Sequence, residues 1–366
     1  MTAKENITAH QKETLAPLGI SVIEDFIGAR SSSRPKERLE EVRQRAVRFR
    51  ERMLAGNPVE YFQSVDIVSA PYPTKYAYLN AVKSLVPFIF LGNRAFIIQF
   101  QTSQGKKTLL FGPADVEGNT KTPFFKLLTD KMGRLGNMTK EKLLPFYSSV
   151  EVELQKAGIP PESIDYISYD HLHTQELRKW MGSSTTPGYF PNAKLLVMRQ
   201  EWESAQGLLV TQKKWYCPDG TRDIPAERVI LLDNSVMLGD GVALVQTPGH
   251  TKGNHSLVVH VNDQIYVSSE NGMSVDSYAP LQSNIPGVKK YAQHFDMEII
   301  LNGNTLENSI DQYISMVMEK TIAGPNPDHP GFFNVISSSE QAHTWHTRTV
   351  QPAFRFGQMK IGQYQS

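Results

Sequence analysis

The sequence of 366 residues predicts an α/β fold, because short apolar runs typical of strands are interspersed with segments of helical periodicity. The strand-like runs recur between Phe88 and Ser268, and helix-like segments lie between and after them. Hydrophobic residues make up 40% of the chain and charged residues 20%, as in ordinary globular proteins. The length leaves open whether the chain forms one large domain or two.

A basic amphipathic helix is predicted over residues 34–53, after three serines and before Gly56-Asn57-Pro58. Its apolar residues recur at spacings of three and four, namely Leu39, Val42, Ala46, Phe49 and Met53. This apolar stripe predicts a helix that docks on the surface of its own domain or, alternatively, at the seam of a homodimer.

Nine apolar runs further along the chain predict strands, at 88–91, 95–100, 107–112, 164–169, 194–198, 229–232, 242–246, 256–261 and 264–268. Gly92-Asn93 separates the first two runs, and Asn262-Asp263 joins the last two as a hairpin. Helices are expected over 139–157, 200–207 and 310–320.

Several features narrow the class of protein. The formal net charge of +1 provides no overall attraction to nucleic acid or to an anionic membrane. Cys217 is the single cysteine, so a disulfide framework and a thiolate-rich metal site are excluded. No run approaches the roughly 20 apolar residues of a membrane span, and the first residues lack the apolar core of a signal peptide. We therefore expect a cytoplasmic protein whose partner is a small molecule.

Two histidine motifs carry the chemistry. His171 and His173 stand two residues apart after a predicted strand, and His250 lies in the turn Thr247-Pro248-Gly249-His250 after another. Three imidazoles that meet at strand ends are typical ligands of zinc or iron.

The order of these motifs resembles the metallo-β-lactamase fold superfamily. The similarity runs from about residue 80 to 323 and includes His171-Leu172-His173, the segment Val197–Trp202, Thr247–Thr251 and Ile299–Asn304. It implies an αββα sandwich with three parts. These are an N-terminal helical extension (1–60), the metallo-β-lactamase-like domain (61–323) and a C-terminal extension (324–366).

The departures from the family pattern fall on its second metal site. The resemblance implies that His171, His173 and His250 form a complete first site. The usual Asp, His and late His of the second site align with Gln175, Glu176 and Asn304. The Asp that bridges two metals aligns with Glu270. Carboxamides are poor ligands for transition metals, so one ion, most simply zinc, is expected instead of two.

A site with one such ion predicts a hydrolase that cleaves an ester, thioester, lactone or amide bond. Neutral imidazoles leave its charge uncompensated, which lowers the pKa of a bound water toward about 7. Glu270 is predicted to complete the coordination. Glu176 is a candidate base, and Gln175 is a candidate to orient the attacking water.

Two alternatives remain. Some members of the family that the chain resembles are mononuclear iron dioxygenases, and His171, His250 and Glu270 offer the two histidines and one carboxylate typical of such iron. The third reading is a non-catalytic binding or sensing protein that kept the fold.

Overall fold

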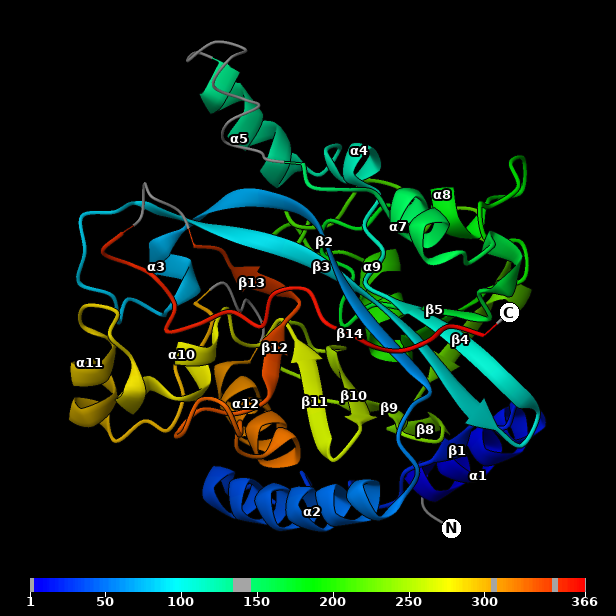
Figure 1. Cartoon of the computed structure of the whole chain (residues 1–366), viewed down its shortest axis with the longest axis horizontal. Helices are drawn as coiled ribbons and strands as arrows, with labels where there is room; N and C mark the ends of the chain where they lie inside the picture. Colours follow the sequence, from blue (N-terminus) through cyan, green and yellow to red (C-terminus); the bar gives the residue numbers. More distant parts are fainter. Residues whose placement is uncertain (1–2, 134–145, 304–307, 344–347, 366) are drawn as a thin grey trace.

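The computed structural model describes residues 3–133, 146–303, 308–343 and 348–365. Two β-sheets face each other, and helices cover the outer face of each sheet (Figure 1). One apolar cluster, which includes Phe96, Phe111, Leu244 and Leu257, lies between the sheets. Separate clusters join each sheet to its outer helices. The chain is therefore an αββα sandwich, as the sequence predicted.

The first sheet combines a mostly antiparallel arrangement with one parallel edge pair. In spatial order it contains β1 (Ser21–Val22), β8 (Val236–Gly239), β9 (Val242–Gln246), β10 (His255–Val261), β11 (Gln264–Ser269) and β12 (Val335–Ser337). The hairpin between β10 and β11 turns at Asn262, whose φ of 54° suits a tight two-residue turn. This hairpin was predicted correctly.

The second sheet is antiparallel on one side and parallel on the other. In spatial order it contains β14 (Lys360–Gly362), β2 (Tyr61–Pro73), β3 (Phe88–Thr102), β4 (Gly105–Phe111), β5 (Tyr166–Ser168), β6 (Lys194–Met198) and β7 (Val229–Leu232). A further strand, β13 (Ser339–Gln341), pairs with β3.

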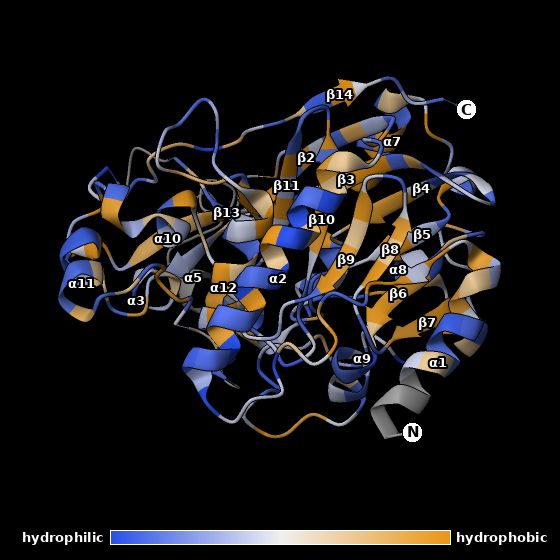
Figure 2. Cartoon of the chain, turned by 90° about the horizontal axis from the view of Figure 1, so that it is seen from below, coloured by the Kyte–Doolittle hydropathy of each residue, from blue (hydrophilic) through white to orange (hydrophobic). Residues whose placement is uncertain are grey.

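The strands are mostly apolar and the exposed sides of the helices mostly polar, as Figure 2 shows. The α-helices are α1 (Ala3–Leu15), α2 (Pro35–Ala55), α3 (Thr74–Ala77), α4 (Val116–Asn119), α5 (Pro123–Gly133), α7 (Val150–Ala157), α8 (Arg178–Met181), α9 (Arg199–Gln206), α10 (Val275–Tyr278), α11 (Val288–Phe295) and α12 (Ser309–Ala323). Short 3-10 helices are η1 (Ala16–Leu18), η2 (Pro161–Ser163), η3 (Ala226–Arg228) and η4 (Pro280–Gln282). Within the described ranges, every helix is too short or too polar to cross a bilayer.

Helix α2 confirms the predicted amphipathic helix. Val42, Ala46, Phe49 and Met53 are buried against α12 and the first sheet, and Leu39 is partly buried there. The basic face has its own contacts, since Arg50 Nη1 donates to the carbonyl oxygens of Ile322 and Ala323 at the end of α12. The apolar stripe therefore packs against the same chain, and formation of a homodimer stays a prediction.

Replacing Phe49 with Ala is expected to lower the free energy of unfolding by about 3–5 kcal/mol, because loss of the buried ring leaves a cavity between α2 and the sheet. The matched control is Val47→Ala on the same helix, where the side chain is 43% exposed and the change should stay within about 0.5 kcal/mol. Urea unfolding of both variants measures the difference. Equal midpoints would show that α2 adds little to the core.

Strand β3 differs from the prediction, because it runs through Gly92-Asn93 without a turn. Gly92 pairs with Ser69 of β2 on one side and with Glu340 of β13 on the other. Strand partners on both sides satisfy the hydrogen bonds of the backbone N–H and C=O groups, and this pairing overrides the local preference of Gly and Asn for turns. The helix predicted over 139–157 begins at Val150 among the described residues, with Ser149 as its cap.

Both terminal segments contribute strands to the sandwich. β1 pairs with β8, β12 extends the first sheet, and β13 and β14 pair with β3 and β2. The division at residues 60 and 323 stays a prediction, and in the structure both segments pack directly on the central sheets.

Candidate metal centre

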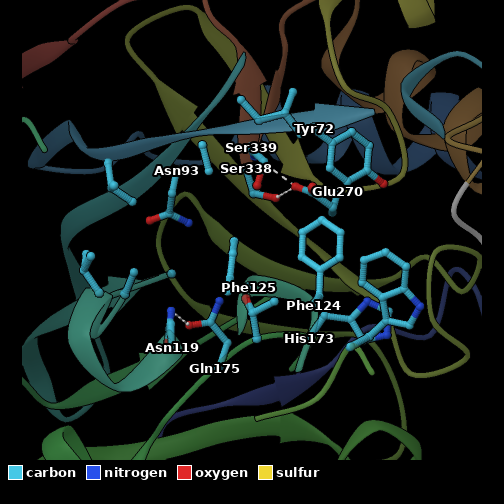
Figure 3. Close-up of a pocket in the computed structure, with 18 of the residues that line it drawn as sticks. Tyr72, Asn93, Asn119, Phe124, Phe125, His173, Gln175, Glu270, Ser338 and Ser339 are labelled. Carbon is cyan, nitrogen blue, oxygen red and sulfur yellow. Dashed lines mark hydrogen bonds between the residues drawn. The ribbon is translucent and has the colours of Figure 1, made fainter. Parts of the chain in front are cut away.

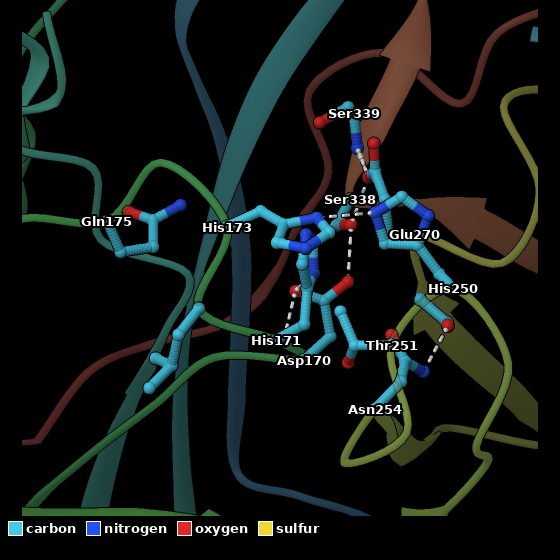
Figure 4. A network of polar contacts seen from close by, with 12 residues as sticks. Asp170, His171, His173, Gln175, His250, Thr251, Asn254, Glu270, Ser338 and Ser339 are labelled. Atoms are coloured by element: carbon cyan, nitrogen blue, oxygen red, sulfur yellow. Dashed lines mark hydrogen bonds and ion pairs between the residues drawn. The ribbon is translucent and has the colours of Figure 1, made fainter. Parts of the chain in front are cut away.

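The predicted histidines lie where strands of both sheets end. His171 and His173 follow β5, His250 follows β9, and Glu270 follows β11 directly. Ser338 lies between β12 and β13 and reaches the same place (Figure 4). Strand ends of α/β proteins commonly position ligands, because the connecting loops there leave the sheet.

His171, His173 and His250 come together, with one ligand atom from each within 4.8 Å of the others. All three side chains are buried. His173 Nδ1 lies 3.1 Å from His250 Nε2. Nitrogens bound at 2.0–2.1 Å to one tetrahedral zinc are about 3.3–3.4 Å apart, so the observed spacing fits a shared ion.

The electrostatics of the three imidazoles also fit a cation. Burial lowers the pKa of His173 and His250 well below the usual value, and the charge of His171 lowers it further. Both rings are therefore neutral and offer lone pairs. Burial acts the same way on His171, but the Asp170 carboxylate outweighs it and raises the pKa of His171 to about 9. A bound metal ion would replace that proton.

Two residues hold the histidines from behind. Asp170 Oδ1 lies 3.1 Å from His171 Nδ1, a typical place for a carboxylate behind a metal-binding histidine. Asn302 Nδ2 lies 3.0 Å from His250 Nδ1. With its oxygen turned toward His250, the Asn302 amide would accept a hydrogen bond from Nδ1–H, which leaves Nε2 free to bind the ion. Asn302 was not singled out from the sequence, and Asn304, the predicted counterpart of the late histidine, lies outside the described residues.

Glu270 lies on the wall of the same cavity but outside the group of three nitrogens. Its Oε2 accepts hydrogen bonds from Ser338 Oγ at 2.6 Å and from Ser339 N at 2.9 Å. Burial, reinforced by the nearby Asp170 carboxylate, raises the pKa of Glu270 to about 7. Its role as a fourth ligand stays a prediction.

The two residues predicted to take part in catalysis, Glu176 and Gln175, lie in different surroundings. Glu176 is buried and pairs with Arg178, whose Nε lies 2.7 Å from its Oε1, and it is not among the described residues that line the cavity. The structure thus does not bring this carboxylate to the histidines. Gln175 does line the cavity, and its Oε1 accepts a hydrogen bond from Asn119 at 3.3 Å.

Glu201 is a buried residue that links the two histidine loops. Its carboxylate accepts hydrogen bonds from Leu172 N at 2.8 Å, from Tyr216 Oη at 3.0 Å and from Thr251 Oγ1 at 2.6 Å. A Cβ at Gly253 would lie 2.3 Å from Glu201 N, so this close approach requires glycine. The available sequence signal for this role was an acidic residue at the start of a predicted helix.

A second buried network supports the turn that carries His250. Asn271 Oδ1 accepts from His250 N at 2.8 Å, and Asn271 Nδ2 donates to Glu319 Oε1 at 2.7 Å. Tyr278 Oη donates to Glu319 Oε2 at 2.7 Å. Because every partner is buried, this network fixes the turn rigidly.

A cavity of about 250 Å³ opens beside the histidines (Figure 3). Most of its described wall is apolar, formed by Val68, Ala70, Pro71, Tyr72, Leu91, Ala114, Val116, Phe124, Phe125, Leu128, Phe146 and Trp215. Arg94 is the basic lining residue in the described part of the chain, and it is ion-paired with Asp66 and Glu340 at 2.9 Å each.

Comparisons with known proteins agree with this description. No protein-family model matches the chain. Two curated N-acyl homoserine lactonases, from Bacillus sp. and Bacillus cereus, are 32% and 30% identical to it over 111 residues. These residues are 29% of this chain and 37% of each lactonase, so the match spans little more than a third of those relatives.

Solved structures with a similar chain trace include a probable metal-dependent hydrolase from Staphylococcus aureus. It is 13% identical, with a TM-score of 0.49 over 71% of this chain and 83% of that chain. A dizinc quorum-quenching lactonase, AidC, is 12% identical, with a TM-score of 0.46 over 84% and 96%. The two facing sheets and the buried histidine triad agree with the αββα sandwich fold that the resemblance to the metallo-β-lactamase superfamily implied.

Proposed function

We propose that this chain is a hydrolase that uses one metal ion to cleave a neutral ester or lactone with an apolar acyl group. The observation that carries this proposal is the buried histidine triad at one end of an apolar cavity. Zinc is the expected ion, because three imidazoles are typical of catalytic zinc sites.

His171, His173 and His250 would hold the ion, which supplies a polarised water when bound. Asp170 and Asn302 keep two of the imidazoles oriented, and buried surroundings strengthen every charge interaction in the site. Glu270 lies on the same wall, and no hydrogen bond from a described residue reaches its Oε1. That oxygen is available to take up a proton, a role that its position favours over the more distant Glu176.

The cavity wall supports the choice of substrate. Aromatic and aliphatic side chains suit an acyl chain, whereas a carboxylate or phosphate would meet no unpaired basic side chain among the described lining residues. The partial match to N-acyl homoserine lactonases favours a lactone as the reacting group.

A series of N-acyl homoserine lactones with increasing acyl length tests this proposal. With zinc-loaded protein, kcat/KM is expected to rise about fourfold for each added methylene that the cavity buries, since each contributes about 0.8 kcal/mol. The rise should stop once the cavity is full. Matched esters that carry a carboxylate on the acyl chain serve as the control and should react much more slowly.

The same preparation separates the alternatives. Purification without chelator or added metal, followed by elemental analysis, should show zinc for a hydrolase and iron for a dioxygenase. The two histidines and one carboxylate typical of such iron are not gathered within 4.8 Å among the described residues, which favours the hydrolase. Absence of hydrolysis of every ester and lactone by the metal-loaded protein would contradict the proposed function.

A further inference from the structure

The side-chain amides of Asn119 and Gln175 are hydrogen-bonded to each other, and Asn119 is also hydrogen-bonded to the backbone just after His173. Asn119, the last residue of α4, accepts a hydrogen bond from Glu176 N through its Oδ1 at 2.9 Å. Its Nδ2 donates to Gln175 Oε1 at 3.3 Å. Asn119 is buried, and both Asn119 and Gln175 line the cavity (Figure 3).

This series fixes which end of the Gln175 amide faces the cavity. A backbone N–H can only donate, so the oxygen of Asn119 must face Glu176. The nitrogen of Asn119 must then face Gln175, and only the oxygen of Gln175 can accept from it. The orientation follows from the fixed donor and does not depend on how amide oxygen and nitrogen are assigned.

Gln175 Nε2 is consequently turned away from Asn119 and toward the cavity (Figure 3). No hydrogen bond joins this nitrogen to another of the described residues. Among the described residues it is therefore an unpaired N–H donor on the wall of the cavity that the three histidines also line.

The backbone around Gln175 is held firmly. Thr174 has a φ of 64°, a left-handed conformation that is strained for a β-branched residue. Its N–H donates to Trp215 O at 2.7 Å. A Cβ on Gly220 would lie 2.4 Å from Gln175 O, so the chain passes too close there for any side chain. The donor is thus preorganised instead of being placed by chance on a mobile loop.

We propose that Gln175 Nε2 donates a hydrogen bond to the carbonyl oxygen of the bound substrate and stabilises the negative charge that develops on it. Asn119 is the positioning residue that keeps the Gln175 nitrogen facing the cavity. This inference rests on the proposed hydrolase function, and it changes the predicted role of Gln175 from orienting water to binding the reacting carbonyl.

The decisive variant is Asn119→Asp. The Asp side chain can still accept from Glu176 N, but it offers only oxygen to Gln175, so the Gln175 amide should turn and present its own oxygen to the cavity. Loss of one such donor typically lowers kcat by about 10²–10³. We expect a fall of this size in kcat, a rise in KM of no more than about tenfold, and nearly unchanged zinc content.

Gln175→Ala should cause a similar fall, because it removes the donor itself. Asn119 also lines the cavity, but we propose that it affects the reaction through Gln175, so the double variant should be no worse than Gln175→Ala alone. Additive losses in the double variant, or a wild-type kcat in Asn119→Asp, would overturn the proposal.

A binding measurement keeps this test separate from that of the proposed function. The probe is 2-octanoylaminocyclopentanone, a ring ketone that presents a carbonyl but has no ester bond to cleave. Its binding is followed through the change in tryptophan fluorescence, since Trp215 is one of the four tryptophans and lines the cavity, in metal-free and zinc-loaded protein. Asn119→Asp and Gln175→Ala should each weaken binding by about tenfold, as expected for one hydrogen bond.

If the ketone binds with this pattern but no lactone is hydrolysed, the proposed hydrolase function is refuted and the role of Gln175 as a hydrogen-bond donor is supported. Failure of the wild type to bind the ketone, or equal affinity in Asn119→Asp, would overturn the donor.

Discussion

Replacing His250 with Ala is expected to remove the bound metal ion and the hydrolytic activity together. His250 Nε2 is one of three nitrogens that surround the candidate site, and the described residues offer no other imidazole within reach. Loss of a residue behind a ligand typically weakens metal affinity by about 10–100-fold, and loss of a ligand itself should cost considerably more. Metal content after gel filtration measures the effect.

Two further variants calibrate this result. Asn302→Ala removes the side chain behind His250 Nδ1 and should weaken zinc affinity by about 10–100-fold without abolishing it. His260→Ala changes a buried histidine of β10 that belongs neither to the triad nor to the described cavity wall, and its zinc content should match that of the wild type. Equal zinc content in His250→Ala and the wild type would place the metal elsewhere.

Replacing Glu201 with Ala is expected to damage both stability and metal binding. The carboxylate accepts hydrogen bonds from Leu172 N, Tyr216 Oη and Thr251 Oγ1, so its removal takes this acceptor away from Leu172 N and Thr251 Oγ1, which are both buried. Each such group costs about 1–3 kcal/mol, and a total loss of about 3–5 kcal/mol is expected. Zinc affinity should fall by about 10–100-fold, because the two histidine loops lose their common anchor.

The control for this change is Glu203→Ala, an exposed position on the same helix. It should leave both quantities unchanged. Glu201→Gln keeps the size and one acceptor oxygen and should recover most of the zinc affinity. Urea unfolding and competition with a zinc chelator measure the two effects. Wild-type zinc affinity in a folded Glu201→Ala protein would refute the linking role.

Much of the sandwich was predictable because its strands have strong local patterns. The β10–β11 hairpin and the stripe of α2 follow from alternation and from helical spacing. β2 was missed, since its buried residues lie on both faces and it contains Pro71 and Pro73. β12, β13 and β14 have three residues each, too few to produce a periodic signal.

The candidate site was predictable to a similar degree. The histidines were found because their types and spacing carry the chemistry of a metal site. Glu201, Asn119 and Asn302 were not, because their roles depend on hydrogen bonds to residues distant in the sequence. Glu176 was predicted to be a catalytic base from its position in the sequence. In the structure its carboxylate instead accepts a hydrogen bond from Arg178.

We infer that the chain binds one metal ion, at His171, His173 and His250. Calorimetric titration of chelator-treated protein with zinc, in the wild type and in His250→Ala, tests it most directly. We expect about one tightly bound ion per wild-type chain, because the second site of the family pattern lacks its imidazoles, and no tight binding in the variant. Two tightly bound ions per wild-type chain, or unchanged binding in His250→Ala, would contradict the assignment.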